Sequence, residues 1–287
     1  MEFEAGIIFA IIAMFAWGFG DFLIQKSTKK IGVWTTLFII TLTGFLVLTP
    51  FALKNAASLF TFGRNIFIVG GIAYLIAAFL DLEALKKGKL DVVEPIWSFE
   101  IVSAALLAFL FLGERITCFQ IVFVILLIIS LVLVSLKSLN FDKRFLVEKG
   151  VYLAFVAAVT MGIANFLIGV GSRNIDPITM KWGMDLFLAV GSFIFVLKNK
   201  ELKGFSKKIK QNKKTILFMS LFDNSAWLAF GFAMALAPIS IAVAISESYI
   251  IIAVLLGYFV NKESLRKHQI IGLILALISA IYLATSL

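Results

Sequence analysis

The chain has 287 residues, of which 61% are hydrophobic and only 15% are charged, and its formal net charge is +9. Soluble domains are about 45–50% apolar and about 25% charged, so this composition excludes an ordinary soluble protein. A single Cys and a single His exclude a disulfide framework and a metal site built from several His residues. The Lys residues lie in short gaps between apolar runs, which predicts contact with anionic lipid headgroups rather than with nucleic acid.

Ten apolar runs follow one another along the chain, each close to the ~20 residues that a membrane-spanning helix needs. They cover about residues 5–25, 33–53, 66–85, 91–112, 117–136, 150–170, 177–197, 215–236, 239–260 and 268–286. The first run differs from a signal peptide because acidic Glu2 and Glu4 precede it and no clear cleavage site follows. The sequence therefore predicts an all-α integral membrane protein with ten transmembrane helices.

The first half of the chain is repeated in the second half. "GFGDFLIQKS" from Gly18 is similar to "GIANFLIGVG" from Gly162, and later "LGERITCFQIV" aligns with "VNKESLRKHQIIG" through Glu114 and Glu263. These similarities predict two five-helix repeats, residues 1–140 and 145–287, with chance similarity between apolar runs as the alternative. Because five is odd, the second repeat must enter the membrane from the opposite side, which makes the repeat inverted.

The positive charges indicate on which side of the membrane each loop lies. All but five of the 26 Lys and Arg residues follow the odd-numbered runs, and the exceptions are Lys54, Arg64, Arg115, Arg173 and Lys181. Lys and Arg are enriched in cytoplasmic loops. We therefore expect a multi-pass protein of the cell (plasma) membrane with its Lys-rich odd-numbered loops in the cytoplasm and both termini outside.

Two stretches carry a resemblance to a known family. They are "AMFAWGFGDFLIQKS" in the first run and "ALKKGKLDVVEPIWSFEIVSAALLAFLFLGERIT" across the third and fourth, with its Pro and its closing Gly-Glu-Arg. With ten spans in two inverted halves, the chain resembles the drug/metabolite transporter superfamily, specifically its EamA-type members. The resemblance implies a central cavity lined by helices 3, 4, 8 and 9 with help from helices 1 and 6. Some relatives keep both termini in the cytoplasm, so that orientation is the alternative.

Charged residues within the apolar runs need a reason, because each costs at least ~2.5–3.5 kcal/mol on insertion scales. The candidates for such a role are Asp21, Glu94, Glu100, Lys181, Asp185, Asp223 and Glu247. Lys181 and Asp185 are four residues apart on one helical face, which predicts a structural ion pair. Glu94, in the first turn of its helix, is interpreted as a partner of the helix dipole. The neighbouring Pro95 permits a bend or a gap toward a cavity.

Glu100 and Glu247 are the leading candidates for a transport site, because each lies well inside its run and the two runs are repeat partners. Trp97 shares a helical face with Glu100, and the polar stretch "ISESY" places Tyr249 close to Glu247. Four successive polar residues cannot all face lipid, so part of this turn must face protein or water. A buried hydrogen-bond network is the alternative interpretation.

Four further residues complete the candidate binding site. Asp223 and Trp227 are four residues apart on one helical face, and Trp17 and Asp21 lie in the first run. A bridged or solvated helix end is an equal interpretation for Asp21, as is simple anchoring for Trp17. The rings of Trp17, Trp97, Trp227 and Tyr249 would hold an apolar or cationic cargo through stacking and cation–π contact.

These features predict a secondary active transporter of small metabolites that works by alternating access and exports amino acids or amphipathic, cationic compounds. Proton coupling is a hypothesis, in which Glu100 or Glu247 binds a proton because desolvation favours the neutral carboxylic acid. No P-loop is present, no cofactor is expected, and the lack of clustered His, Asp and Cys argues against an enzyme. The alternatives are a sugar or nucleotide-sugar transporter of the same fold and a non-transporting or lipid-handling subunit. A working monomer is expected, with a dimer as the alternative.

Overall fold

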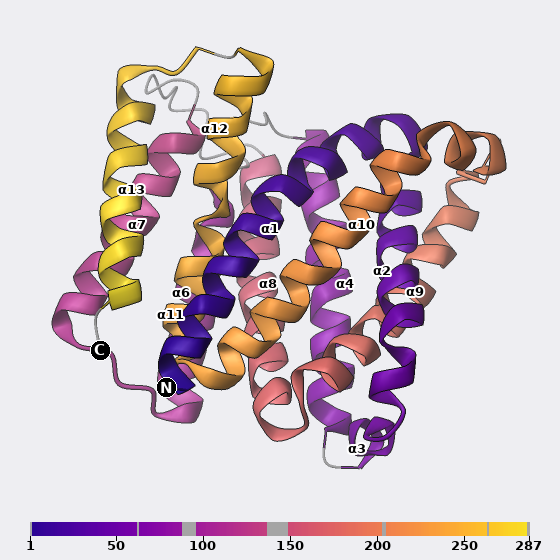
Figure 1. Cartoon of the computed structure of the whole chain (residues 1–287), viewed down its shortest axis with the longest axis horizontal. Helices are drawn as coiled ribbons and strands as arrows, with labels where there is room; N and C mark the ends of the chain where they lie inside the picture. The colour runs from indigo at the N-terminus through magenta and orange to yellow at the C-terminus, as the bar shows by residue number, and fades with distance from the viewer. Residues whose placement is uncertain are drawn as a thin grey trace.

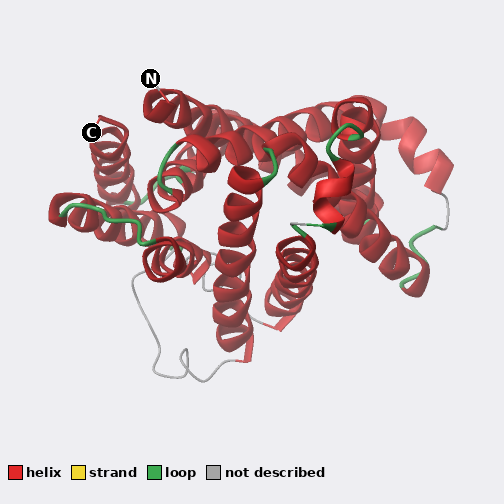
Figure 2. Ribbon diagram, turned by 90° about the horizontal axis from the view of Figure 1, so that it is seen from below, coloured by secondary structure: helices red, strands yellow, loops and turns green. Residues whose placement is uncertain are grey.

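A computed structural model describes residues 2–61, 63–87, 96–136, 149–202, 205–262 and 264–285. Within these ranges the chain forms helices joined by turns and loops, and no strand is present there (Figure 2). The all-α prediction is therefore confirmed for the described residues.

The described residues contain nine segments long and apolar enough to cross a membrane. In chain order the helices are α1 (Glu2–Ile31), α2 (Val33–Ala52), α3 (Ala56–Phe60), α4 (Arg64–Lys87), α6 (Phe99–Leu112), α7 (Cys118–Ser135), α8 (Lys149–Asn174), α9 (Pro177–Lys198), α10 (Phe205–Leu236), α11 (Ile239–Glu247), α12 (Tyr249–Asn261) and α13 (Lys267–Thr285). Helices α11 and α12 together form one span, whereas α6, with 14 residues, is shorter than a full span. Nine of the ten predicted spans thus have their helix. The remaining predicted span, residues 91–112, is the fourth in chain order and contains α6. Its first part, with Glu94 and Pro95, lies outside the described residues.

Several helix ends follow directly from the local sequence. Thr117 and Gln120 form a capping box at the start of α7, in which each side chain bonds the other residue's backbone N–H. The Asp176 side chain caps α9 by accepting from the Thr179 N–H at 2.8 Å, next to a Pro in the first turn. Helix α6 ends at Gly113, whose φ of 63° is a left-handed conformation that Gly adopts without steric cost.

The outer surface of the helices is apolar. Phe51, Phe111 and Phe259 are 65%, 72% and 71% exposed, and many Leu, Ile and Val side chains share this surface. A soluble protein rarely exposes such large apolar areas, whereas lipid tails cover them in a membrane. Helices also satisfy their own backbone hydrogen bonds, as the bilayer core requires. The chain is therefore a multi-pass membrane protein.

The two halves of the chain pack against each other along their full length (Figure 1). Helix α1 lies along α10 and α4 lies along α8, while α2 pairs with α9 and α7 with α13. Under the sequence alignment of the halves, α1 corresponds to α8 and α4 to α10. When each helix is replaced by its counterpart in the other half, the pair α1–α10 becomes the pair α8–α4. The pairs α2–α9 and α7–α13 are unchanged by the same replacement. Both chain ends lie at the same end of the molecule in Figure 1.

The repeated phrase that begins at Gly18 and at Gly162 marks two equivalent close contacts. A Cβ on Gly18 would lie 2.4 Å from the Cβ of Ile252 in α12, and a Cβ on Gly162 would lie 2.4 Å from the Cβ of Ser103 in α6. Ile252 and Ser103 are themselves aligned by the offset that pairs Glu114 with its repeat partner. Small residues at such crossings let helix backbones approach closely within a membrane. Both glycines are therefore required for the same packing reason.

Candidate functional site

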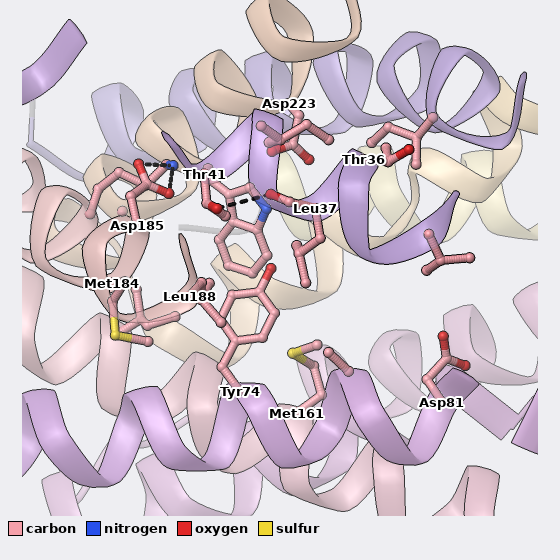
Figure 3. Close-up of a pocket in the computed structure, with 18 of the residues that line it drawn as sticks. Thr36, Leu37, Thr41, Tyr74, Asp81, Met161, Met184, Asp185, Leu188 and Asp223 are labelled. Atoms are coloured by element: carbon pink, nitrogen blue, oxygen red, sulfur yellow. Dashed lines mark hydrogen bonds and ion pairs between the residues drawn. The ribbon is translucent and has the colours of Figure 1, made fainter. Parts of the chain in front are cut away.

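A cavity of about 240 Å³ lies between the two halves of the chain. It is lined by residues of α1, α2, α4, α8, α9 and α10 together with Trp97. Figure 3 shows Tyr74 and Asp81 rising from α4 on one wall, with Asp185 and Asp223 on other walls. The volume is just below the 300–1,000 Å³ typical of ligand pockets, so it suits a small molecule.

The two ends of the cavity differ in burial. Near the junction of α8 and α9 the wall is formed by Ser172, Pro177 and Gly231, all of which are buried. Near the junction of α1 and α2 the wall includes Val33, which is 37% exposed, and partly exposed Thr28. From this difference in burial we infer that the cavity is closed at the α8–α9 end and more open at the α1–α2 end.

A polar network of Lys181, Asp185 and Asn224 forms part of the cavity wall. The Lys181 Nζ donates to both carboxylate oxygens of Asp185 and, at 2.9 Å, to Asn224 Oδ1. Asn224 Nδ2 in turn donates to the backbone carbonyls of Ile40 and Ser220, at 3.0 and 2.8 Å. The predicted ion pair is therefore confirmed. Its place on the cavity wall was not foreseen, although a Lys in the middle of an apolar run is a signal for such a site.

Asp223 lies on the cavity wall beside a cluster of aromatic rings. Its side chain is buried, with 8% of the residue exposed, and it makes no hydrogen bond within the part of the chain that the structure describes. Trp227, one turn later in α10, also lines the cavity and its ring lies 5.1 Å from that of Tyr74. Trp17 packs 5.0 Å from Trp227 and 6.0 Å from Tyr249. The structure thus brings four of the predicted site residues together. Asp223 and Trp227 line the cavity, and Trp17 and Tyr249 pack behind them.

Glu100 and Glu247, from the two repeat-partner helices, also meet. Both are buried, at 6% and 7% exposure, and their carboxyl groups lie close enough to influence each other's charge. Asn165 Nδ2 donates to Glu100 Oε2 at 3.4 Å. A proton on one of the two carboxyl groups would allow a hydrogen bond between them, because an ionised carboxylate can only accept. Neither glutamate lines the cavity, so this pair forms a separate site.

The helix of each glutamate is irregular beside it. Ser98 precedes α6 and Ser248 separates α11 from α12, and each accepts a backbone hydrogen bond from three residues on, from Ile101 at 3.3 Å and Ile251 at 2.9 Å. This spacing is that of a 3₁₀ turn, which inside a helix often marks a hinge. The two glutamates therefore lie next to irregular turns that are within one residue of equivalent positions in repeat-partner helices.

Two predicted residues remain, Trp97 and Asp21. Trp97 lines the cavity, and its Nε1 donates to Asp81 Oδ1 at 2.8 Å. Asp81 was not singled out from the sequence, because it lies near the end of its apolar run. Asp21 is partly buried in α1 and is not among the residues that line the cavity.

The helices that line the cavity differ from those implied by the resemblance. Helices α2 and α9 contribute much of the wall, whereas α11 and α12 contribute none of the described lining residues. The physical reason is the crossing of the helices, since α2 and α9 pair directly beside the cavity and α11 packs against α1 and α6 instead. Such crossings are tertiary features that apolar periodicity does not encode.

Beyond the closed end of the cavity, the Glu114 side chain and Arg173 connect the ends of several helices. We call the contacts of these two residues the Glu114 latch. Glu114 Oε1 accepts from Arg173 Nη2 at 2.8 Å and from the backbone N–H of Ile239 at 2.8 Å. Glu114 Oε2 accepts from the backbone N–H and the hydroxyl of Ser240, at 3.3 and 3.2 Å. Arg173 also donates to two backbone carbonyls at the end of α10, those of Met234 and Ala237. The latch therefore ties α6, α8, α10 and α11 together at this end.

Comparison with known proteins decides the family. The family model described as "EamA-like transporter family" matches the chain twice, over residues 4–136 and 148–285. The chain belongs to the EamA-like transporter family. This EamA-like protein is thus a membrane transporter of the drug/metabolite transporter type, and the two matched ranges are two copies of the EamA unit.

The fold of this EamA-like protein is also found among solved structures. One of them, described as "Crystal structure of protein", is similar over 98% of this chain and 96% of its own, with a TM-score of 0.79 and 14% sequence identity. At this identity the likeness shows the fold alone. A search of curated proteins finds no match to the chain.

Proposed function

We propose that this EamA-like protein is a secondary active transporter that carries a small metabolite through the cavity by alternating access. The observation that supports this proposal best is the cavity between the two halves, closed at the α8–α9 end by the Glu114 latch and more open at the α1–α2 end. A cavity open toward one side of the membrane is the arrangement that one half of such a cycle requires.

We further propose ten membrane spans in two inverted repeats. The fourth span along the chain is the one that contains α6. Three observations support the inversion: the helix pairs exchange between the halves, Gly18 and Gly162 make equivalent contacts, and the helices of Glu100 and Glu247 are irregular within one residue of equivalent positions. Related by such symmetry, the two halves can exchange their arrangements and so open the cavity toward the other side.

The distribution of positive charge supports an orientation. The α1–α2 junction follows an odd-numbered run and carries Lys26, Lys29 and Lys30, so it is assigned to the cytoplasm. The cavity is then open toward the cytoplasm, from which an exported cargo would enter it. A tag at the N-terminus and a cysteine placed near the start of α10 test this orientation, because they should react with impermeant reagents from opposite sides of the membrane.

Proton coupling is proposed for the Glu100–Glu247 pair. A proton shared between two buried carboxyl groups can leave only if the negative charge gains another partner, such as water admitted when the neighbouring helices move. The irregular turns beside both residues supply a place for such movement. The protonation state of the Glu100–Glu247 pair would then depend on the conformation of the protein. Proton transfer and transport can be coupled only if this is so.

Proteoliposomes with an imposed pH gradient test this proposal. Purified protein should accumulate or release small amines and amino acids faster with the gradient than without it, and a double variant with Glu100→Gln and Glu247→Gln should lose that difference. Asp176→Asn is the matched control, because Asn also caps a helix and this residue lies outside the cavity lining. Transport that ignores the gradient in the unmodified protein would contradict proton coupling, and absence of any transport would contradict the transporter cycle itself.

A further inference from the structure

The charged groups of the cavity wall indicate which chemical class of cargo fits it. Within the described residues, the wall contains three carboxylates, those of Asp81, Asp185 and Asp223, and a single basic side chain, that of Lys181. The charge of a suitable cargo therefore depends on which of these four side chains can still form a hydrogen bond or an ion pair with it.

Lys181 is not available. Its ammonium group has three N–H donors, and the structure provides three acceptor atoms for them, two on Asp185 and one on Asn224. Asn224 is in turn fixed by two backbone carbonyls, so the network cannot turn toward the cavity without losing hydrogen bonds. A carboxylate on the cargo would thus find no free cation and would face like charges.

Asp223 is available. It is about nine-tenths buried, faces the cavity, and receives no hydrogen bond from any described residue. A buried carboxylate without hydrogen bonds is unfavourable, and a positively charged donor from a cargo would relieve this. Ser172, elsewhere on the wall, also has a buried hydroxyl without a partner among the described residues.

The surroundings of Asp223 suit a cation with an apolar body. The rings of Trp227 and Tyr74 both line the cavity and pack against each other, with their centroids 5.1 Å apart and their planes inclined by 38°, so they form one aromatic side of the wall. Aromatic faces attract ammonium groups, more strongly where water is excluded. Most of the remaining wall is apolar, for example Leu37, Met184 and Leu188, which are visible in Figure 3.

We propose that the cavity binds small monoamines that lack a carboxylate, with the ammonium group on Asp223 and beside the rings of Trp227 and Tyr74. This inference rests on the proposed transport function and narrows it, because it selects cationic amines over zwitterionic amino acids. The Lys181–Asp185 pair then acts as a filter that keeps the only basic group of the described wall occupied.

Binding of matched ligands to the full-length protein in nanodiscs tests this inference. The probes are phenethylamine, phenylalanine methyl ester and phenylalanine, which share one aromatic body and one ammonium group but differ in the carboxylate. By isothermal titration and thermal unfolding, the amine and the ester should bind and phenylalanine should bind about tenfold more weakly or not at all. Equal affinity for phenylalanine, or no binding of either cation, would overturn the proposal.

A variant of Asp223 separates recognition from folding. Asp223→Asn should weaken phenethylamine binding by about tenfold or more, since hydrogen bonds to charged groups are among the strong ones. The melting temperature of the empty variant should not fall, because a neutral amide is easier to bury than an unpaired carboxylate. Trp227→Leu should weaken the amine several-fold without changing the charge. Asp176→Asn, outside the cavity, is the control and should leave affinity unchanged; an unchanged affinity in Asp223→Asn would refute the assignment.

The transport assay keeps this inference distinct from the proposed function. If proteoliposomes transport phenylalanine in preference to phenethylamine, the transporter cycle stands and the amine assignment falls. If neither proteoliposomes nor binding experiments respond to any small molecule, the proposed function itself falls.

Discussion

Removal of the Glu114 carboxylate should open the closed end of the cavity. Glu114→Ala eliminates the ion pair with Arg173 and three further hydrogen bonds to the first residues of α11. A hydrogen bond to a charged group contributes about 1.5–3 kcal/mol, and partial exposure of the Arg173 side chain, 27%, weakens the ion pair. A net loss of about 2–3 kcal/mol would change the ratio of closed to open molecules by roughly 30- to 150-fold.

Cysteine labelling measures this change. Cys118 is the chain's single cysteine and is exposed, so it is first replaced by Ser. Ser172→Cys then places a thiol on the wall near the closed end, where residue 172 is 3% exposed. An impermeant maleimide added on the side of the termini should react with Cys at position 172 at least about tenfold faster when Glu114 is replaced by Ala.

Glu201→Ala is the matched control for this experiment. Glu201 accepts two hydrogen bonds of 2.8 Å from Thr35, at the opposite end of α9 from the latch. Loss of the Glu201 side chain should not increase the rate at which a maleimide added on the side of the termini reacts with the thiol at position 172. The reasoning is refuted if Glu114→Ala, shown to be folded by its melting curve, labels at the same rate as its parent.

Three further substitutions test the packing and the helix caps. Gly44→Ala would place a Cβ 2.0 Å from Asn224 Oδ1 and 2.2 Å from Asp185 Oδ2, so it should disrupt the Lys181 network and destabilise the protein by about 1–3 kcal/mol in thermal unfolding. Gly70→Ala, whose nearest neighbour would be 3.4 Å away, should instead leave the melting temperature unchanged or raise it, because Ala favours helix. Asp176→Ala should cost about 1 kcal/mol through the lost cap of α9, and a melting temperature equal to that of Asp176→Asn would contradict this role.

The sequence predicts the helices well because their signals are local. Apolar run length defines the spans, and the duplicated phrase at Gly18 and Gly162 leads to two equivalent helix contacts. The meeting of Glu100 and Glu247 was within reach of the sequence for a similar reason, since both lie deep in repeat-partner runs where an unpaired charge is costly.

The parts of the site that escaped prediction depend on contacts between distant segments. Arg173 looked like an ordinary loop charge, and only the fold shows that it joins Glu114 to the end of α10. The Thr residues of α2 gave no clear signal either, because hydroxyls such as that of Thr41 bond carbonyls of their own helix even where they border the cavity. Sequence periodicity identifies the buried face of a helix but not the neighbour that covers it.

The pairing of acidic residues across the two halves has a consequence for how the protein is made. Glu100 enters the bilayer well before its hydrogen-bond partner Asn165 and its neighbour Glu247 have been synthesised, and α1 and α2 likewise are made before the helices that pack on them, α10 and α9. At about 5–20 residues per second, the ribosome needs on the order of ten seconds to reach Glu247. During that interval a newborn first half exposes a carboxyl group to lipid or to the insertion machinery. Co-expressed fragments should therefore rescue each other, whereas the amino-terminal fragment alone should be degraded.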